Sequence, residues 1–267
     1  MNINVIKIGG KIIEDPALLR TFLQDAARIS GPKLLVHGGG RNATQLARRL
    51  GVETTMVEGR RVTDTAMLEV VVMVYGGLIN KQIISKLQSF GCNALGLTGA
   101  DMNCIVATRR PAEPIDYGWV GDIAEVHTAP LLTLLQQGIT PVLAPITHDG
   151  QGHLLNTNAD TITGRVASAL SAAATVNTYY LFEKAGVLSD PADEQSVIPE
   201  LSEDHYRRLR EQGAVAEGMI PKLDNAFRAL HAGVKNVYIA HYQAVSQLGT
   251  DHFKGTRLCL PPNTSTH

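Results

Sequence analysis

Glycine runs at the ends of two apolar strands place the strongest constraint on the fold of this chain. Residues 4–8 run into Gly9 and Gly10, and residues 34–37 run into a triple glycine at 38–40. Three glycines in a row lose much backbone entropy on folding, and an ordinary loop does not require them. Because ligands of open α/β sheets bind where strands end, these turns predict sites where the backbone closely approaches a ligand.

The alternation of strand and helix continues along the chain. Further strands are expected at 94–97, 140–144, 176–182 and 236–240, and helices at 40–50, 65–89, 131–137, 160–172, 203–212 and 222–232. Asp15 and Pro16 indicate another helix start, and residues 148–152 a hairpin-type turn. Such alternation favours a mostly parallel sheet covered by helices on both faces, so the sequence predicts an α/β fold.

Charge, hydropathy and cysteine usage exclude several classes of protein. With 24 basic and 25 acidic residues, the formal charge of -1 lacks the positive field of a nucleic-acid binder. The longest apolar run, 70–79, is shorter than the roughly 20 residues that span a bilayer, so we interpret it as a buried helix and expect no membrane partner. No secretory signal follows Met1, which favours the cytoplasm. Cys92, Cys104 and Cys259 are isolated and indicate neither disulfides nor a zinc site.

Two lysines occupy positions that suit phosphate. Lys7 lies beside Gly9 and Gly10, whose N–H groups can approach an anion with no Cβ in the way, although a plain glycine turn with a surface lysine explains the same residues. Lys222 lies in the first turn of a helix, where a cation is unfavourable unless an anion binds nearby; a surface position is the alternative. His37 is interpreted as a packed histidine rather than a catalytic base.

Arginine and asparagine side chains form two further candidate sites. Arg60 and Arg61 precede a helix start, and guanidinium forks bind carboxylates bidentately, although a solvated, capped loop is the simpler account. Asn156, Asn158 and Asp160 fit either a polar ligand or a turn and helix cap. Neither glycine turn matches the G-x-x-x-x-G-K-[ST] or G-x-G-x-x-G nucleotide motifs.

Eight segments carry a resemblance to a known family. In order they are KIGG at 7–10, HGGG at 37–40, GRRVT at 59–63, NK at 80–81, GLTGAD at 96–101, GWVGDI at 118–123, NTNAD at 156–160 and MIPK at 219–222. They resemble the amino-acid kinase family and, within it, the kinases that phosphorylate N-acylated glutamate. The resemblance is collinear from about residue 3 to 260, which makes it more specific than any one motif.

The resemblance implies a three-layer αβα sandwich with a mostly parallel central sheet. An N-terminal lobe, residues 1–173, is expected to bind the acylglutamate and make homodimer contacts. A C-terminal lobe, residues 174–260, is expected to bind ATP, and 261–267 to form a disordered polar tail. ATP with Mg²⁺ is the implied co-substrate, and no tightly bound, protein-liganded metal is expected.

The resemblance also implies a role for each matching residue. Lys7 and Lys222 would neutralise the transferring phosphoryl group, with Asp160 holding both lysines. Substrate binding is assigned to Gly39, Gly40, Arg60, Arg61, Asn156 and Asn158, and nucleotide binding to Gly9, Gly10, Glu183, Gly186 and Lys222. A γ-carboxylate with a pKa of about 4.3 is already ionised at neutral pH, so the reaction needs alignment of two anions and no general base.

Two positions depart from the family pattern. Glu183 stands where aspartate is common, and Arg60 stands where an apolar residue usually precedes the substrate arginine. A second guanidinium there favours an extra carboxylate, so N-succinyl-L-glutamate is an alternative substrate to N-acetyl-L-glutamate. Exposure to solvent or pairing with Glu58 explains Arg60 as well.

Other interpretations of the function of this chain stay open. A non-catalytic ligand-binding relative of the fold is one alternative, and an NAD-dependent dehydrogenase is a weaker one because the chain lacks the dinucleotide turn. Since the first strand starts within a few residues of Met1, a homodimer that arginine does not inhibit is expected.

Overall fold

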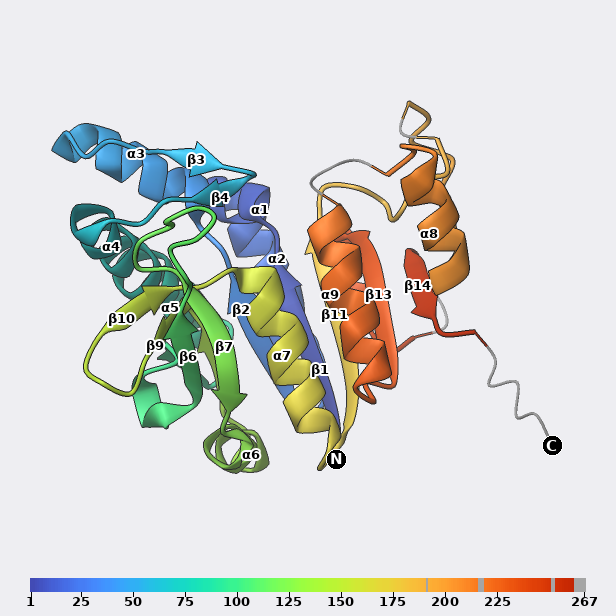
Figure 1. The fold of residues 1–267 in the computed structure, drawn as a ribbon. Helices are drawn as coiled ribbons and strands as arrows, with labels where there is room; N and C mark the ends of the chain where they lie inside the picture. Colours follow the sequence, from blue (N-terminus) through green and yellow to red (C-terminus); the bar gives the residue numbers. More distant parts are fainter. Residues whose placement is uncertain (191, 216–218, 251–252, 262–267) are drawn as a thin grey trace.

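The protein is built around one large, mostly parallel sheet (Figure 1). The computed structural model describes residues 1–190, 192–215, 219–250 and 253–261. The strand order is β12 (Glu200–Ser202), β14 (Thr256–Cys259), β13 (Asn236–His241), β11 (Thr175–Phe182), β1 (Asn2–Ile8), β2 (Lys33–His37), β8 (Thr140–Leu143) and β5 (Ala94–Leu97). All neighbours pair in parallel except β13 and β14. The predicted α/β fold is confirmed.

Helices cover both faces of this sheet, which gives three layers (Figure 1). In β1, Ile3 and Val5 enter one core and Ile6 and Ile8 the other, because successive side chains of a strand point to opposite faces. The first core packs against α6 (Thr128–Gln136), α7 (Ala159–Ser171), α8 (Glu203–Glu211) and α9 (Ile220–His231). The second packs against α1 (Gly10–Glu14), α2 (Pro16–Arg28), α3 (Gly40–Leu50), α4 (Thr65–Val71) and α5 (Asn80–Ser89).

Helix α2 forms where the sequence predicted it, and α1 was not expected. Asp15 caps α2 by accepting hydrogen bonds from the N–H groups of Ala17 and Leu18, at 2.8 and 3.1 Å, and Pro16 takes the first helical position. The first glycine turn leads directly into α1, a single short helix that buries Ile12 and Ile13.

Several short strands beside the main sheet were missed by the sequence analysis. A second sheet has the order β10 (Leu154–Asn156), β9 (Ile146–His148), β6 (Ile105–Arg109) and β7 (Gly121–Val126), and β3 (Met56–Val57) pairs with β4 (Arg60–Arg61). The predicted hairpin turn lies between β9 and β10. β7 is partly exposed and contains two acids, so it lacks the continuous apolar run that identifies the buried strands.

The helix expected at 65–89 is continuous but contains the π-helical segment Val72–Ile79. Thr65–Ser89 is the one described helix that is long and apolar enough to cross a membrane, with a mean hydropathy of 1.4 over its most apolar window. Val70, Val74 and Ile79 are buried in the second core, whereas Met73 and Leu78 are exposed. The helix is therefore a core helix with one apolar outer side. The sequence analysis expected a buried helix, and on this outer side that expectation was wrong.

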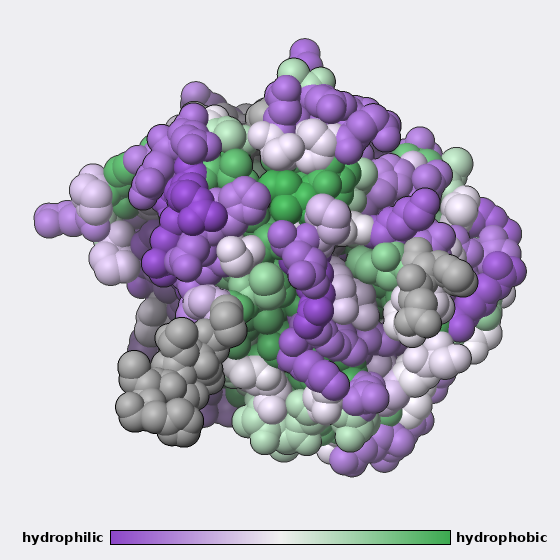
Figure 2. All heavy atoms as spheres, turned by 90° about the vertical axis from the view of Figure 1, so that its right-hand side faces the viewer, coloured by the Kyte–Doolittle hydropathy of each residue, from purple (hydrophilic) through white to green (hydrophobic). Residues whose placement is uncertain are grey.

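The main sheet joins strands from both sides of residue 173, the expected lobe boundary, which itself lies in the turn between α7 and β11. β1, before it in sequence, pairs along its length with β11, after it. The face over α8, α9 and β14 is mostly hydrophilic, with hydrophobic atoms between hydrophilic ridges (Figure 2). The division into an acylglutamate lobe and an ATP lobe stays a prediction, and residues 262–267 of the expected tail lie outside the described residues.

Candidate functional site

Three charged side chains meet at the carboxyl end of β1. Lys7 shares the face of Ile3 and Val5, and therefore points toward α7 and α9. Asp160 is the second residue of α7 and Lys222 the third of α9, so both helices direct their N-terminal turns to this point. The Nζ atoms of Lys7 and Lys222 each lie 3.0 Å from a different carboxylate oxygen of Asp160. We call these residues the lysine–aspartate triad.

The triad is a buried ion cluster with one excess positive charge. Burial alone would raise the pKa of Asp160, but the ammonium groups of Lys7 and Lys222 outweigh burial and lower it to about 2. The positive end of the α7 dipole also favours a carboxylate in the first turn. The carboxylate is thus fixed in its charged form, and the two lysines that it holds retain capacity for a further anion.

Two cavities meet at the triad. The arginine cavity, about 240 Å³, is lined by Arg60, Arg61 and Arg110 together with Lys7 and Asp160. The lysine cavity, about 420 Å³, is lined by Lys7, Lys11, Lys184 and Lys222. Lys7 and Gly40 line both cavities, so a group that passes from one cavity to the other moves past these two residues.

The arginine cavity brings together every residue that the sequence assigned to substrate binding. Arg61 is buried and donates from one guanidinium nitrogen to Gly40 O and Thr44 Oγ1, both at 2.8 Å. Asn158 caps α7 through Thr161 N, at 3.0 Å, and Asn156 donates to Thr63 Oγ1, also at 3.0 Å. The lining also includes Gly39 and Gly40.

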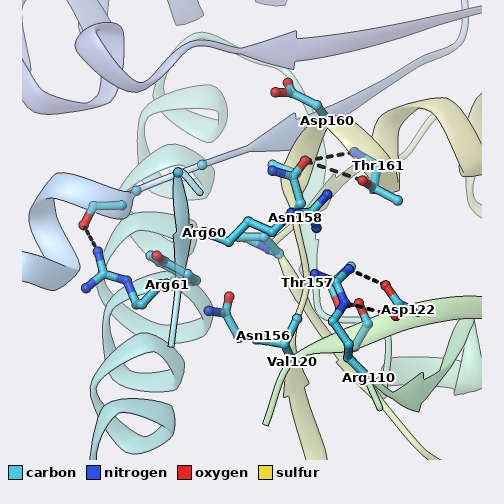
Figure 3. Close-up of a pocket in the computed structure, with 18 of the residues that line it drawn as sticks. Arg60, Arg61, Arg110, Val120, Asp122, Asn156, Thr157, Asn158, Asp160 and Thr161 are labelled. Atoms are coloured by element: carbon cyan, nitrogen blue, oxygen red, sulfur yellow. Dashed lines mark hydrogen bonds and ion pairs between the residues drawn. The ribbon is translucent and has the colours of Figure 1, made fainter. Parts of the chain in front are cut away.

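Arg60 and Arg61 diverge although they are neighbours in β4. Figure 3 shows Arg61 directed toward α3 and Arg60 extended across the cavity toward Asn158. Arg60 is exposed, and its guanidinium makes no hydrogen bond or ion pair with a described residue. The pairing with Glu58 that the sequence left open is not formed.

Several lining residues of the arginine cavity carried no role in the sequence analysis. Arg110 forms a two-pronged ion pair with Asp122, and this pair raises the pKa of the guanidinium (Figure 3). Tyr75 reaches the cavity from the π-helical segment. The GWVGDI motif contains Asp122 and was a usable signal, whereas nothing in the local sequence around Tyr75 distinguishes it from other core residues.

The lysine cavity contains most of the residues expected to bind nucleotide. Gly9, Gly10, Glu183 and Lys222 line it, and Glu183 lies 3.5 Å from Lys11 Nζ. Gly9 is required sterically, because a Cβ there would lie 2.9 Å from Leu181 O. Arg41, paired with Glu14 at 3.0 Å, lines the same cavity and was missed.

Gly186 does not reach either cavity. It is buried under β14, where a Cβ would lie 2.6 Å from Thr256 Oγ1, and the following amide of Val187 donates to that hydroxyl at 2.8 Å. The structure therefore explains this glycine by close packing of a loop on a strand.

His37 is a packed histidine in the structure, as interpreted from the sequence. It is fully buried, and burial lowers its pKa to about 4, which the hydrogen bond to Gly38 opposes only in part. A ring with this pKa is neutral at pH 7 and has no access to a substrate proton.

The described acidic, histidine and cysteine side chains form no group of three that could hold a metal ion. Glu14 and Glu183 line the lysine cavity, but each is engaged with a cation. Mg²⁺ commonly binds through one or two carboxylates together with substrate phosphates, so these residues fit an ion that arrives with a nucleotide.

Comparison with known proteins shows the family of this chain. Residues 2–241 match the family model described as the amino acid kinase family. The chain is 54% identical over 254 residues to the acetylglutamate kinase of Parabacteroides distasonis, covering 95% of this chain and 98% of that one. It is also 54% identical over 243 residues to the acetylglutamate kinase of Bacteroides thetaiotaomicron, covering 91% and 95%.

A solved structure supports the fold independently. The crystal structure of a Streptococcus mutans protein superposes with a TM-score of 0.77 at 26% identity, covering 96% of this chain and 98% of that one. The family match spans the whole lysine–aspartate triad and the lining of both cavities up to residue 241. The chain belongs to the amino-acid kinase family.

Proposed function

We propose that this protein transfers the γ-phosphoryl group of ATP to the γ-carboxylate of N-acetyl-L-glutamate, as a cytoplasmic acetylglutamate kinase of arginine biosynthesis. The observation that carries the proposal is the lysine–aspartate triad at the junction of the two cavities. Two anions must approach each other there, and the triad offers an excess cation at that point. The two relatives at 54% identity, which match this chain over nearly their full length, are both acetylglutamate kinases.

The residues divide the reaction between binding and charge neutralisation. Arg61, with Asn156 and Asn158, binds the acylglutamate in the arginine cavity, so that its γ-carboxylate faces Lys7. ATP occupies the lysine cavity, where Gly10 donates its N–H to the phosphates and Glu183 lies beside the nucleotide. The donor role expected of Gly9 does not hold, because its N–H is bonded to Leu181 O at 2.9 Å; Gly9 contributes only the absence of a Cβ. Lys7 and Lys222 neutralise the charge of the transferring group, and the carboxylate oxygen attacks phosphorus as the ADP oxygen leaves.

Mg²⁺ enters this scheme as the partner of ATP. When bound, it neutralises charge on the phosphate oxygens. Lys222 and Lys7 act on the same charge from the protein side. Together with Mg²⁺, two lysines and a few glycine N–H groups therefore suffice to neutralise the transferring phosphoryl group.

The proposed activity is tested by incubating the protein with ATP, Mg²⁺ and N-acetyl-L-glutamate in the presence of hydroxylamine. An acyl phosphate reacts to a hydroxamate, which a colour reaction with iron detects. Hydroxamate that depends on both ATP and the acylglutamate supports the kinase. Binding of both ligands without hydroxamate would establish the non-catalytic relative instead.

Arg60 favours N-succinyl-L-glutamate as a second candidate substrate. Arg110 is neutralised by Asp122, and Arg61 donates to Gly40 O and Thr44 Oγ1, whereas the exposed guanidinium of Arg60 has no hydrogen bond or ion pair with a described residue. If Arg60 binds the second carboxylate of a succinyl group, wild type has a higher kcat/KM for the succinyl than for the acetyl substrate. The change Arg60→Leu should reduce that preference by about 1 to 3 kcal/mol, the scale of a charge-assisted hydrogen bond.

Paired kinetics with the two acylglutamates measure this preference. The matched control is Arg49→Leu, an exposed arginine near the end of α3 that lines neither cavity. If wild type prefers the acetyl substrate, or if both arginine variants behave alike, Arg60 does not recognise the acyl group.

We also propose that the protein is a homodimer joined at the β5 end of the sheet. β5 is an outer strand, so one row of its backbone groups is left for another chain. Leu95 in β5 is 40% exposed, and Met73 and Leu78 in the adjacent long helix are 49% and 53% exposed. Every exposed large hydrophobic side chain in the described ranges lies within residues 1–102.

Light scattering should therefore give twice the 28.7 kDa mass of one chain. The change Leu78→Glu places a charge in the apolar contact and should yield monomers at micromolar concentration. Leu50→Glu is the control, because Leu50 is equally exposed, at 55%, at the end of α3. A monomeric wild type, or a Leu78→Glu protein that stays dimeric, would place the interface elsewhere.

A further inference from the structure

His37 and Asn80 form a buried pair beneath the triple glycine, and the proposed reaction assigns neither of them a role. His37 ends β2 and Asn80 begins α5, directly after the π-helical segment. They are 0% and 1% exposed. Because side chains alternate along β2, His37 lies on the face of Leu35, where α5 packs, and on the opposite side from Val36.

The hydrogen bonds of this pair determine the tautomer of the ring. Asn80 Nδ2 lies 3.0 Å from Val142 O, and a carbonyl oxygen only accepts, so the amide nitrogen must occupy this position. The same Nδ2 lies 3.2 Å from His37 Nε2, which therefore accepts its second hydrogen. His37 Nδ1 lies 2.8 Å from Gly38 O and must donate to it. All three bonds require a neutral imidazole with its hydrogen on Nδ1.

The bond from His37 to Gly38 O sets the direction of the next amide. The Gly38–Gly39 peptide is trans, and in a trans peptide the C=O and N–H bonds point in opposite directions. With Gly38 O held against the buried ring, the N–H of Gly39 points away from the core, on the side where residues 38–40 line the arginine cavity. This N–H makes no hydrogen bond to the rest of the described chain.

The loop is also pressed against the π-helical segment. Gly39 has φ 151°, and a Cβ on it would lie 2.4 Å from Ile79 Cδ1, so only glycine fits this position. Ile79 directly precedes Asn80, which means that one short stretch of helix contacts the loop twice, by packing and through the hydrogen-bonded ring.

We propose that Asn80 and His37 are positioning residues that hold the Gly39 N–H toward the acceptor carboxylate in the arginine cavity. Asn80 donates to His37, and His37 donates to Gly38 O; the result is one aligned backbone donor, the Gly39 N–H. The proposal rests on the proposed function, because the acceptor carboxylate belongs to the acylglutamate. Gly39 does not line the lysine cavity, so the relay concerns the acylglutamate and not ATP.

The variants Asn80→Leu, His37→Leu and the double variant test the relay. Loss of one charge-assisted hydrogen bond should raise the Kd for N-acetyl-L-glutamate and lower kcat/KM by roughly 10- to 100-fold, with the Kd for an ATP analogue unchanged. The double variant should lose no more than the larger single variant, because both residues act through the same amide. Trp119, the one tryptophan of the chain, adjoins the cavity residue Val120 and gives a fluorescence signal for binding that does not depend on turnover.

Asn177→Leu is the matched control. Asn177 forms hydrogen bonds with Asn4 and Asn236, at 3.4 and 2.9 Å, near the amino ends of three strands of the same sheet. This variant should lose stability while binding acylglutamate normally. If the His37 and Asn80 variants lose only stability in the same way, with unchanged acylglutamate affinity, the pair is purely structural and the proposal is wrong.

A measurement on the wild type covers the case in which the core variants do not fold. ¹⁵N NMR of the imidazole, assigned through its contacts with Asn80, shows directly which ring nitrogen carries hydrogen. Hydrogen on Nδ1 alone supports the relay, and hydrogen on Nε2 or on both nitrogens overturns it. Hydroxamate formation by the wild type is measured separately, so failure of the kinase activity is not confused with failure of the relay.

Discussion

Replacing Lys222 by alanine is expected to lower kcat by roughly 10²- to 10³-fold while the KM for N-acetyl-L-glutamate changes little. Lys222 lines the lysine cavity and not the arginine cavity, so it contacts the phosphoryl donor side. A group that stabilises charge on the transferring phosphoryl group acts mainly in the transition state, and its loss lowers turnover more than ground-state binding. Steady-state kinetics with ATP and the acylglutamate measure both parameters.

Lys7→Ala should lower kcat on the same scale, with a larger rise in KM because Lys7 lines both cavities. Lys235→Ala is the control, since Lys235 is an exposed lysine just beyond the opposite end of α9. Unchanged turnover in either Lys7→Ala or Lys222→Ala would remove the triad from the mechanism.

The change Asp160→Asn is expected to reduce both turnover and stability. The side chains of Lys7 and Lys222 are only 10% and 21% exposed, so loss of the carboxylate leaves two buried ammonium groups facing each other. Removing one member of a buried ion cluster costs about 3 kcal/mol or more of the free energy of unfolding. Urea denaturation measures the stability, and kcat should fall at least about tenfold because neither lysine is held in place.

The difference in the free energy of unfolding between wild type and Asp160→Asn should decrease as the pH falls. Because the pKa of Asp160 is lowered from 3.8 to about 2, its contribution is fully present above pH 3.8 and is lost as the pH falls toward 2. The gap between wild type and Asp160→Asn should therefore narrow across this window. Asp224→Asn serves as the control, since this carboxylate bonds to Tyr206 and Arg210 outside both cavities. If Asp160→Asn and Asp224→Asn lose the same stability with the same pH dependence, Asp160 has no special role.

The sequence alone determined the fold class and the positions of most buried elements. β1, β2, β8, β11 and β13 are mostly apolar segments, and such strands are recognisable because both faces of a parallel sheet are buried. The glycine turns were recognisable from the glycine runs that follow two of these strands. These properties depend on local composition and period, which the linear chain displays directly.

Apart from what the family resemblance implied, only the tertiary structure shows which polar residues act together. Lys7, Asp160 and Lys222 are separated by more than 60 residues at each step, and only the packing of α7 and α9 on the face of β1 brings their charges to 3.0 Å. The same holds for Asn80, which reaches His37 across the other face. Local sequence does not encode the face or depth at which a side chain meets a distant partner, because both follow from strand order and helix packing. For that reason Tyr75, Arg41 and the role of the π-helical segment became visible only in three dimensions.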